Sequence, residues 1–428
     1  MLRDHIGFTL FMSLLLIAPK IPLKGHGGVE RSSMSLGLAG LIIWFFAHPK
    51  KLFLFPRMGA SHPLLLLVIF AIYAFVISLL SASIVSIAYA VQFLAYAVIG
   101  TILMRRYARS YIRADNRRAG LIFFGIAVIY AIGIIISLFT GPIYRFQTFW
   151  TVRSWGGFRI QQGVGFSEGQ NMAGAVVAFF IAACIYLYRG KNWKRWILLC
   201  LLLFVLLTTL SRSAIISFVL ALTIVLCLSN LRPFVQRGSI KVSVVKDAGF
   251  VASALGLLII IIVLGIYLIN KSFLPAVLSG LGLSSEHDLF VSSLVDRFHL
   301  WRWGLSSWAS QNLLKMIFGG GFRSSMTISS YGTWHTAHNV YITILGDFGV
   351  VGLSIFLAAL LGALWRYTRL FLTDKAGRFE KFGLMAVLAL SIQNMTGEFF
   401  YSPVCLSLLI FTYAATIVKD NSECLTTL

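Results

Sequence analysis

The chain has 428 residues, of which 58% are hydrophobic and 12% are charged, and its formal net charge is +22. A mean hydropathy of +0.87 excludes a water-soluble globular protein of this length. Apolar residues come in blocks of about 18–25, the length of a helix that crosses a bilayer core, and not in the short alternating strands of a membrane barrel. We therefore expect an all-α integral membrane protein, with residues 1–428 forming a single polytopic domain.

Twelve apolar stretches predict about twelve transmembrane helices. In chain order they cover residues 6–23, 34–48, 63–83, 84–104, 119–140, 170–188, 196–211, 213–230, 248–270, 338–365, 382–396 and 399–418. The first contains Pro19 and Lys20 and lacks a small-residue cleavage site, so we expect a retained helix and not a signal peptide. The five cysteines show no metal-ligand spacing, and we expect them to be small buried residues.

The basic residues predict the orientation of these spans. With both termini in the cytoplasm, the inner loops are 49–62, 105–118, 189–195, 231–247 and 366–381, and they carry 22 of the 36 Lys and Arg residues. Short cytoplasmic loops are enriched in Lys and Arg, so the net charge reflects topology and can contact anionic lipid without a nucleic-acid partner.

A long outer loop, residues 271–337, separates the ninth and tenth spans. Apolar residues recur there at spacings of three and four over residues 294–310, which predicts an amphipathic helix at the membrane interface. Its apolar face is Leu294, Phe298, Trp301, Leu305 and Trp308. Three glycines, 319–321, end this region in a turn.

Several arginines are expected at the outer level of the membrane. Arg212 lies in the short connection after the seventh span, Arg159 precedes the sixth span, and Arg297 lies in the long loop. An arginine at the membrane boundary needs a partner, and its donors match phosphate oxygens. We therefore expect a lipid diphosphate there, although Arg212 could instead reach lipid headgroups and Arg297 could merely neighbour Asp296.

Two histidines stand at the start of the tenth span, in the stretch HTAHNVYITILGDFGVVGL. A neutral His338 could accept a proton from a sugar hydroxyl, since the positive end of a helix disfavours the imidazolium. His335 could orient the acceptor. Glu398, in the last turn between spans, and Asp347 are rival bases, although Asp347 fits a helix-packing contact better. The alternatives are a helix-capping role for His338 and a zinc site of His299, His335 and His338, which lacks the usual spacing.

These motifs resemble the O-antigen ligase and polymerase family of bacterial membrane glycosyltransferases. The resemblance covers roughly residues 155–365 and rests on TLSRSA, DRFHLWRWGL, GGGF and RIQQGVGFSEGQNMAG, the last containing Arg159 and Asn171. It rests above all on the stretch with His338, Asn339, Asp347, Gly349 and Gly352. Asp347 stands where Glu is common, and the H-x-x-H spacing leaves ligase and polymerase both open. The two glycines fit close helix packing or a kink.

The resemblance implies that a glycan moves from undecaprenyl diphosphate to an acceptor on the periplasmic face of the bacterial inner membrane. A ligase uses the lipid A–core as acceptor, and a polymerase uses another lipid-linked repeat; we expect the ligase. The family implies inversion at the anomeric carbon with neither a metal ion nor another cofactor.

The expected site has His338 and His335 as catalytic residues and Arg212, Arg297 and Arg159 as diphosphate ligands. Asn339, Glu398 and Arg302 are further candidates. A lipid-linked oligosaccharide transporter or flippase is the alternative from another class, although it should place polar groups at the bilayer midplane. A non-enzymatic scaffold is a third hypothesis. The outward arginines argue against it, because a scaffold has no need of unpaired charge there.

Overall fold

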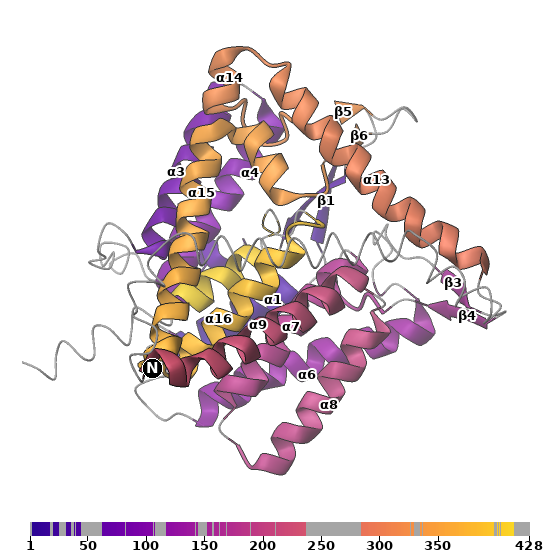
Figure 1. Ribbon diagram of the computed structural model, residues 1–428, viewed down its shortest axis with the longest axis vertical. Helices are drawn as coiled ribbons and strands as arrows, with labels where there is room; N and C mark the ends of the chain where they lie inside the picture. The colour runs from indigo at the N-terminus through magenta and orange to yellow at the C-terminus, as the bar shows by residue number, and fades with distance from the viewer. Residues whose placement is uncertain are drawn as a thin grey trace, which may run out of the picture.

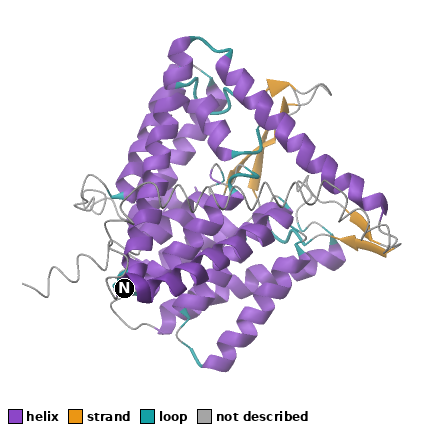
Figure 2. Ribbon diagram, viewed as in Figure 1, coloured by secondary structure: helices purple, strands orange, loops and turns teal. Residues whose placement is uncertain are grey.

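The structure is a computed structural model of helices joined by short two-stranded hairpins (Figures 1 and 2). It describes residues 2–17, 20–24, 31–35, 38, 40–43, 62–81, 83–105, 107, 117–141, 143, 152–155, 158–161, 163–167, 169–188, 190–209, 211–236, 284–325, 327–328, 334–335, 337–397, 400, 402 and 404–414.

Six helices in this described part are long and apolar enough to cross a membrane. They are α3 (Pro63–Leu80), the helix Ile84–Arg105 that contains α4 (Ile84–Ala95) and the π-helical turn η2 (Tyr96–Gly100), α6 (Arg117–Thr140), α7 (Gln170–Leu187), α9 (Arg212–Gln236) and α15 (Val340–Leu372). They coincide with six of the predicted spans. The chain is therefore a helical multi-span membrane protein.

The other predicted spans correspond to shorter helices or lie outside the described residues. The shorter helices are α1 (Leu2–Leu16), α8 (Asn192–Thr208), α16 (Arg378–Gln393) and Val404–Ala414. The predicted span 248–270 lies wholly outside the described residues, and only 38 and 40–43 are described as helical in span 34–48. A total of twelve spans thus stays a prediction.

The expectation of a first span reaching residue 23 is wrong. The helix ends at Leu16, and strand β1 (Lys20–Lys24) pairs antiparallel with β2 (Arg31–Ser35). Pro19, which the prediction kept inside the span, precedes the strand, and proline is unfavourable in a helix interior. Two further hairpins join β3 (Val152–Trp155) to β4 (Phe158–Gln161) and β5 (Thr327–Ile328) to β6 (Trp334–His335).

Helix α7 forms the centre of the bundle, and 78% of its span is buried, the largest share among the six candidates. It packs against α8, α9 and α16. Phe179 of α7 meets Phe382 of α16 edge-on, with ring centroids 5.1 Å apart, and Phe180 contacts Phe123 of α6 at 5.4 Å. By contrast, α3, α6, α8 and α9 expose large apolar side chains, such as Leu80, Phe139, Trp196 and Ile216. These outer faces suit lipid contact and would be unfavourable in water.

Helix α15 is a helical hairpin, contrary to the expected continuous span 338–365. Gly349 has φ 65° and ψ −171°, which no helix contains. Tyr341 and Phe356 would lie about 22 Å apart along one straight helix, yet their ring centroids are 6.1 Å apart. The chain therefore rises through a short arm, 340–348, and returns through a long arm, 350–372, with Gly349 at the tip (Figure 1).

Backbone contacts join the hairpin tip to α14 (Leu313–Phe318). A Cβ on Gly349 would lie 2.3 Å from the carbonyl oxygen of Ile317, and a Cβ on Gly319 would lie 2.3 Å from that of Asp347. The Tyr73 hydroxyl of α3 donates to the carbonyl oxygens of Phe318 (2.7 Å) and Phe348 (3.2 Å). One side chain thus serves the last carbonyls of two helices, which have no partner within the helix.

The amphipathic helix of the long loop is α13 (Ser284–Ala309), and its orientation differs from the predicted one. Gly304 is buried against α15, where a Cβ would lie 2.8 Å from Ile342 Cγ2. Phe298 and Leu305, expected on the apolar face, are 47% and 43% exposed. The close approach at Gly304 turns these two side chains outward, while Trp301 and Trp308 stay half-buried.

Gly349→Ala should destabilise the protein, because alanine disfavours this left-handed conformation by about 1–3 kcal/mol and its Cβ would clash with α14. Thermal unfolding of the purified protein in detergent would show a lower midpoint. Gly125→Ala is the matched control, since a Cβ there has no neighbour within 4 Å and alanine favours a helix by about 0.5–1 kcal/mol. Equal midpoints for both variants would contradict the strained tip.

Candidate active site

The N-termini of α7 and α9 meet the C-terminus of α16 in one hydrogen-bonded network. The hydroxyls of Ser211 and Ser213 donate to Asn171 Oδ1 at 2.8 Å and 3.4 Å. Gln393 Nε2 donates to the carbonyl oxygen of Asn171 at 2.9 Å. We call these four residues the Asn171 network. It fixes two helix N-termini, which carry positive partial charge, at one level of the bundle.

Arg212 is held between the two serines of this network. It is the first residue of α9, half-buried, and both of its neighbours bind Asn171. Arg232 lies about 30 Å further along α9, which is the thickness of a bilayer hydrocarbon core. The spacing of the two arginines therefore matches the thickness of a bilayer core, and the position of Arg212 at the outer boundary stays a prediction.

The short arm of α15 begins beside the Asn171 network. The backbone N–H of Val340 donates to the carbonyl oxygen of Asn394, at 2.9 Å, one residue after Gln393. Asn339 caps the helix, because its Oδ1 accepts from the N–H groups of Tyr341 (3.0 Å) and Ile342 (3.3 Å). A third helix N-terminus therefore lies at this level, and the candidate Asn339 has a structural role there.

His338 directly precedes this cap, with an exposed side chain. Its φ of 46° is one of three positive values among the non-glycine residues that the structure describes. Residues held in sparsely populated backbone regions cluster at functional sites. The surrounding structure therefore holds the backbone of His338 in a sparsely populated conformation directly before the cap.

Arg297 reaches the same place from α13. Its Nη1 donates to the carbonyl oxygen of Thr396, two residues after Asn394. Burial lowers the pKa of this guanidinium below its ordinary value, but an arginine remains protonated at neutral pH. The structure thus brings Arg297 to the start of α15 as a partly desolvated cation, and an anion there would meet permanent positive charge.

Asp347, near the hairpin tip, organises the turn that follows α14. Its carboxylate accepts from the N–H groups of Arg323 and Ser325, both at 2.8 Å, and its carbonyl oxygen accepts from Gly320 and Gly321. The side chain is fully buried. Asp347 is therefore a packing residue, as expected, but it holds a loop and not a neighbouring helix.

The remaining predicted residues are only partly described. Arg159 lies in β4 opposite Ser154, and His335 lies in β6 opposite Thr327, but their side chains are outside the described part. Glu398 is also outside it. Arg302 lies five residues after Arg297 on α13, and its side chain is exposed.

Sequence reasoning missed the roles of Gln393 and Asn394. Both lie at the end of an apolar span, and an amide pair there gives no sign of its partners. The sequence did contain one sign of this network. Asn171 and the serines that flank Arg212 are polar residues at the ends of predicted spans, where such residues often link neighbouring helices.

The comparison with known families adds a separate observation. Residues 197–357 match a family model described as O-Antigen ligase. This part of the chain is an O-antigen ligase family domain. It includes Arg212, Arg297, His335 and His338, whereas Arg159 and Glu398 fall outside the match. A search of curated proteins gives no match.

The O-antigen ligase domain confirms the resemblance that the motifs indicated over the wider range 155–365. Proteins of this family are membrane glycosyltransferases of the ligase or polymerase type, and they act on lipid-linked glycans. The match runs from α8 through α9, α13 and α14 into α15, the helices that carry the two described arginines and His338.

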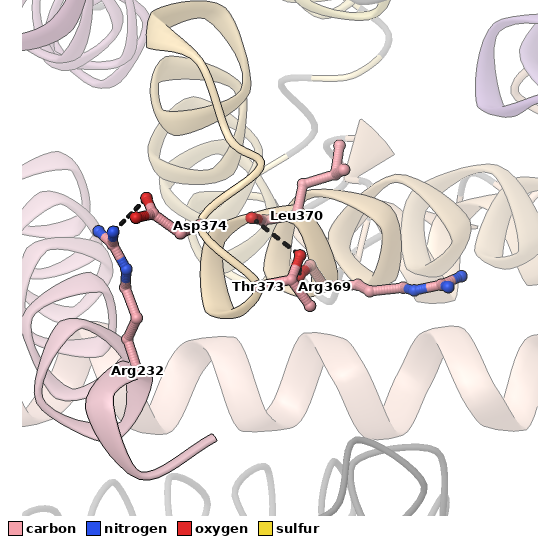
Figure 3. Close-up of polar contacts among 5 residues, drawn as sticks. All are labelled: Arg232, Arg369, Leu370, Thr373 and Asp374. Atoms are coloured by element: carbon pink, nitrogen blue, oxygen red, sulfur yellow. Dashed lines mark hydrogen bonds and ion pairs between the residues drawn. The ribbon is translucent and has the colours of Figure 1, made fainter. Parts of the chain in front are cut away.

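The opposite end of α9 carries an ion pair. Arg232 Nη2 pairs with the carboxylate of Asp374, just after α15, and Figure 3 shows Arg369 pointing away from this pair. The Asp374 side chain is 51% exposed. Exposed ion pairs of this kind contribute about 0–1 kcal/mol to the free energy of unfolding. The Arg232–Asp374 pair is therefore a weak interaction with which the buried contacts of Asp347 can be compared.

Asp347→Asn should lower the thermal unfolding midpoint far more than Asp374→Asn. Asparagine supplies one oxygen where Asp347 uses two, so its NH₂ group would face a buried backbone N–H at a cost of about 1–3 kcal/mol. The asparagine introduced by Asp374→Asn would keep the left-handed backbone and lose only an exposed pair. Thermal unfolding in detergent compares the two variants, and a larger loss for Asp374→Asn would contradict the anchoring role of Asp347.

Proposed function

We propose that the protein is an O-antigen ligase of the bacterial inner membrane. It transfers a glycan from undecaprenyl diphosphate to a sugar of the lipid A–core on the periplasmic face. One observation carries this proposal. Arg212, Arg297 and His338 all lie at the hydrogen-bonded ends of α7, α9, α15 and α16.

The two arginines suit the diphosphate. Each guanidinium carries permanent charge and offers several donors to phosphate oxygens. The N-termini of α7, α9 and α15 add partial positive charge at the same level. This fixed charge would stabilise the negative charge that develops on the leaving diphosphate and could take the place of a metal ion.

His338 suits the proton acceptor. Its nitrogen takes the proton of an acceptor hydroxyl while that oxygen attacks the anomeric carbon of the donor sugar. The bond from this carbon to the diphosphate oxygen breaks, and undecaprenyl diphosphate leaves with the bonding electrons. A single displacement of this kind inverts the anomeric centre. The exposure of the His338 side chain beside the start of α15 supports this role.

His338→Ala and Arg212→Ala should each abolish glycan transfer. Removing a general base lowers rates by about 10²–10⁴-fold, and removing a charge that stabilises the leaving group has a similar effect of about 10²–10³-fold. The measurement is the lipopolysaccharide ladder on a gel, in a host that makes a lipid-linked O-antigen and lacks its own ligase.

Arg369→Ala is the matched arginine control, because Arg369 is exposed in the last turn of α15, near the Arg232–Asp374 pair (Figure 3). Protein level in the membrane should be equal in all variants. A ladder that persists in both His338→Ala and Arg212→Ala would exclude the mechanism. If the wild type yields no ladder but extends single repeats in a polymerase-deficient host, the acceptor is another lipid-linked repeat.

A further inference from the structure

Two tryptophans of α13 differ in the hydrogen bonding of their indole N–H groups. Trp308 is half-buried, and its Nε1 donates to the carbonyl oxygen of Met316 at 3.1 Å. Trp301 is also half-buried, and its Nε1 is shielded from solvent but has no hydrogen-bond partner in the part of the chain that the structure describes. A buried indole N–H usually has a partner, because leaving it unpaired is unfavourable. The donor of Trp301 therefore needs an explanation.

Trp301 lies on the face of α13 that meets the candidate active site. Arg297, four residues before it, donates to the carbonyl oxygen of Thr396. Gly304, three residues after it, lies so close to the start of α15 that an added Cβ would be 3.1 Å from that of Ala337. Residues at spacings of three, four and seven share one face of a helix. Trp301 therefore lies between these two contacts.

The indole ring of Trp301 has a defined neighbour and some open surface. Phe298 meets it edge-on, with ring centroids 5.2 Å apart, and is itself 47% exposed. The Trp301 side chain is partly exposed as a whole, although its nitrogen is covered. A change of side-chain rotamer would bring the N–H to the open surface, where a ligand can reach it.

The position of Trp301 matches that of the sugar attached to the donor diphosphate. Under the proposed function, Arg297 binds the diphosphate, and His338 takes the proton of the acceptor hydroxyl. In a single displacement, the anomeric carbon lies between the leaving diphosphate oxygen and the attacking hydroxyl oxygen. The first sugar of the donor therefore lies between Arg297 and His338, beside the stretch of α13 that carries Trp301.

We propose that the indole N–H of Trp301 donates a hydrogen bond to an oxygen of the sugar attached to the donor diphosphate. This inference rests on the proposed function and adds a sugar-binding residue to it. An indole nitrogen is a donor only, and sugar oxygens are acceptors, so the two groups are complementary. The acceptor glycolipid offers the same kind of oxygen, so the experiment separates the two substrates.

The test compares wild type with Trp301→Phe and Trp308→Phe in phosphatidylcholine nanodiscs. Both replacements remove an indole N–H and keep an aromatic ring on the same helix, but only Trp308 donates within the described part of the protein. A further variant carries β-(3-benzothienyl)alanine at position 301, where sulfur replaces the N–H in a ring of nearly the same shape. This variant removes the donor without the cavity that a smaller ring leaves.

Thermal unfolding without substrate should distinguish the two tryptophans. Trp308→Phe should lower the midpoint, because the hydrogen bond to Met316 is lost. The benzothienyl variant at position 301 should not lower it, since that N–H contributes no hydrogen bond to the fold. A decrease as large as that of Trp308→Phe would show that the Trp301 N–H already has a partner in the protein, and would overturn the proposal.

Initial rates are measured with the undecaprenyl diphosphate-linked O-antigen repeat and the lipid A–core of the host used for the ladder assay. Trp301→Phe and the benzothienyl variant should raise the KM for the donor about 3–10-fold, the usual effect of one hydrogen bond. Their KM for the acceptor, and both KM values of Trp308→Phe, should stay within about 2-fold of wild type. An unchanged donor KM in the benzothienyl variant would overturn the proposal, and so would an increase confined to the acceptor KM.

A binding measurement without acceptor separates the sugar from the diphosphate and needs no catalysis. The glycan-linked lipid should raise the unfolding midpoint of wild type more than undecaprenyl diphosphate alone, and the benzothienyl variant should lose only this difference. Equal stabilisation of wild type by the two lipids would overturn the proposal. A wild type that transfers nothing contradicts the proposed function, while a sugar-dependent stabilisation that the variant loses still supports the hydrogen bond.

Discussion

The architecture depends on the requirement that buried backbone polar groups find hydrogen-bond partners within the protein. A continuous helix would pair its backbone groups internally, but α15 turns at Gly349 and leaves groups at the turn without partners in the helix. The groups exposed by this turn are satisfied by Tyr73 and by the glycines after α14, and those at the start of the short arm by Asn339 and Asn394. Closing these helix ends brings α3, α14 and α16 to the hairpin.

The same closure positions the charged groups. The turn after α16 accepts from both Val340 and Arg297, so the start of the short arm and the crossing helix α13 share one support. Asp347 thus holds the backbone of Arg323 at the tip of the arm, while the turn after α16 holds Arg297 near the start of the arm.

Long apolar runs allowed the positions of six spans to be predicted, because crossing a bilayer imposes a minimum length and excludes charge. Arg212 could be placed at a boundary for the same reason, since a short connection leaves no alternative. The hairpin could not be predicted, because a glycine at a left-handed turn and a glycine in close helix packing look alike in sequence. The apolar residues 340–372 therefore fit one continuous helix as well as two arms.

The face of α13 was also ambiguous. Its apolar residues recur so often that two overlapping stripes satisfy the spacing of three and four, and only the partner helix selects one. Gly304 determines which stripe faces the protein, because the absence of a side chain lets α13 approach Ile342 of the short arm. The hydrophobic pattern alone gave no weight to this glycine. Likewise, the Asn171 network joins residues more than 200 positions apart, which no local pattern reveals.

The contact at Gly304 also gives α13 a pivot. A Cβ at this position would lie 2.8 Å from Cγ2 of Ile342 and 3.1 Å from Cβ of Ala337, so the backbone of α13 rests directly on these two side chains. Arg297 lies seven residues away along the helix, on a lever arm of about 10 Å. A tilt of about 10° around the pivot would move Arg297 by about 2 Å, enough to break its hydrogen bond to Thr396. Small rotations of α13 would therefore move this cation into or out of the site without unpacking the helix.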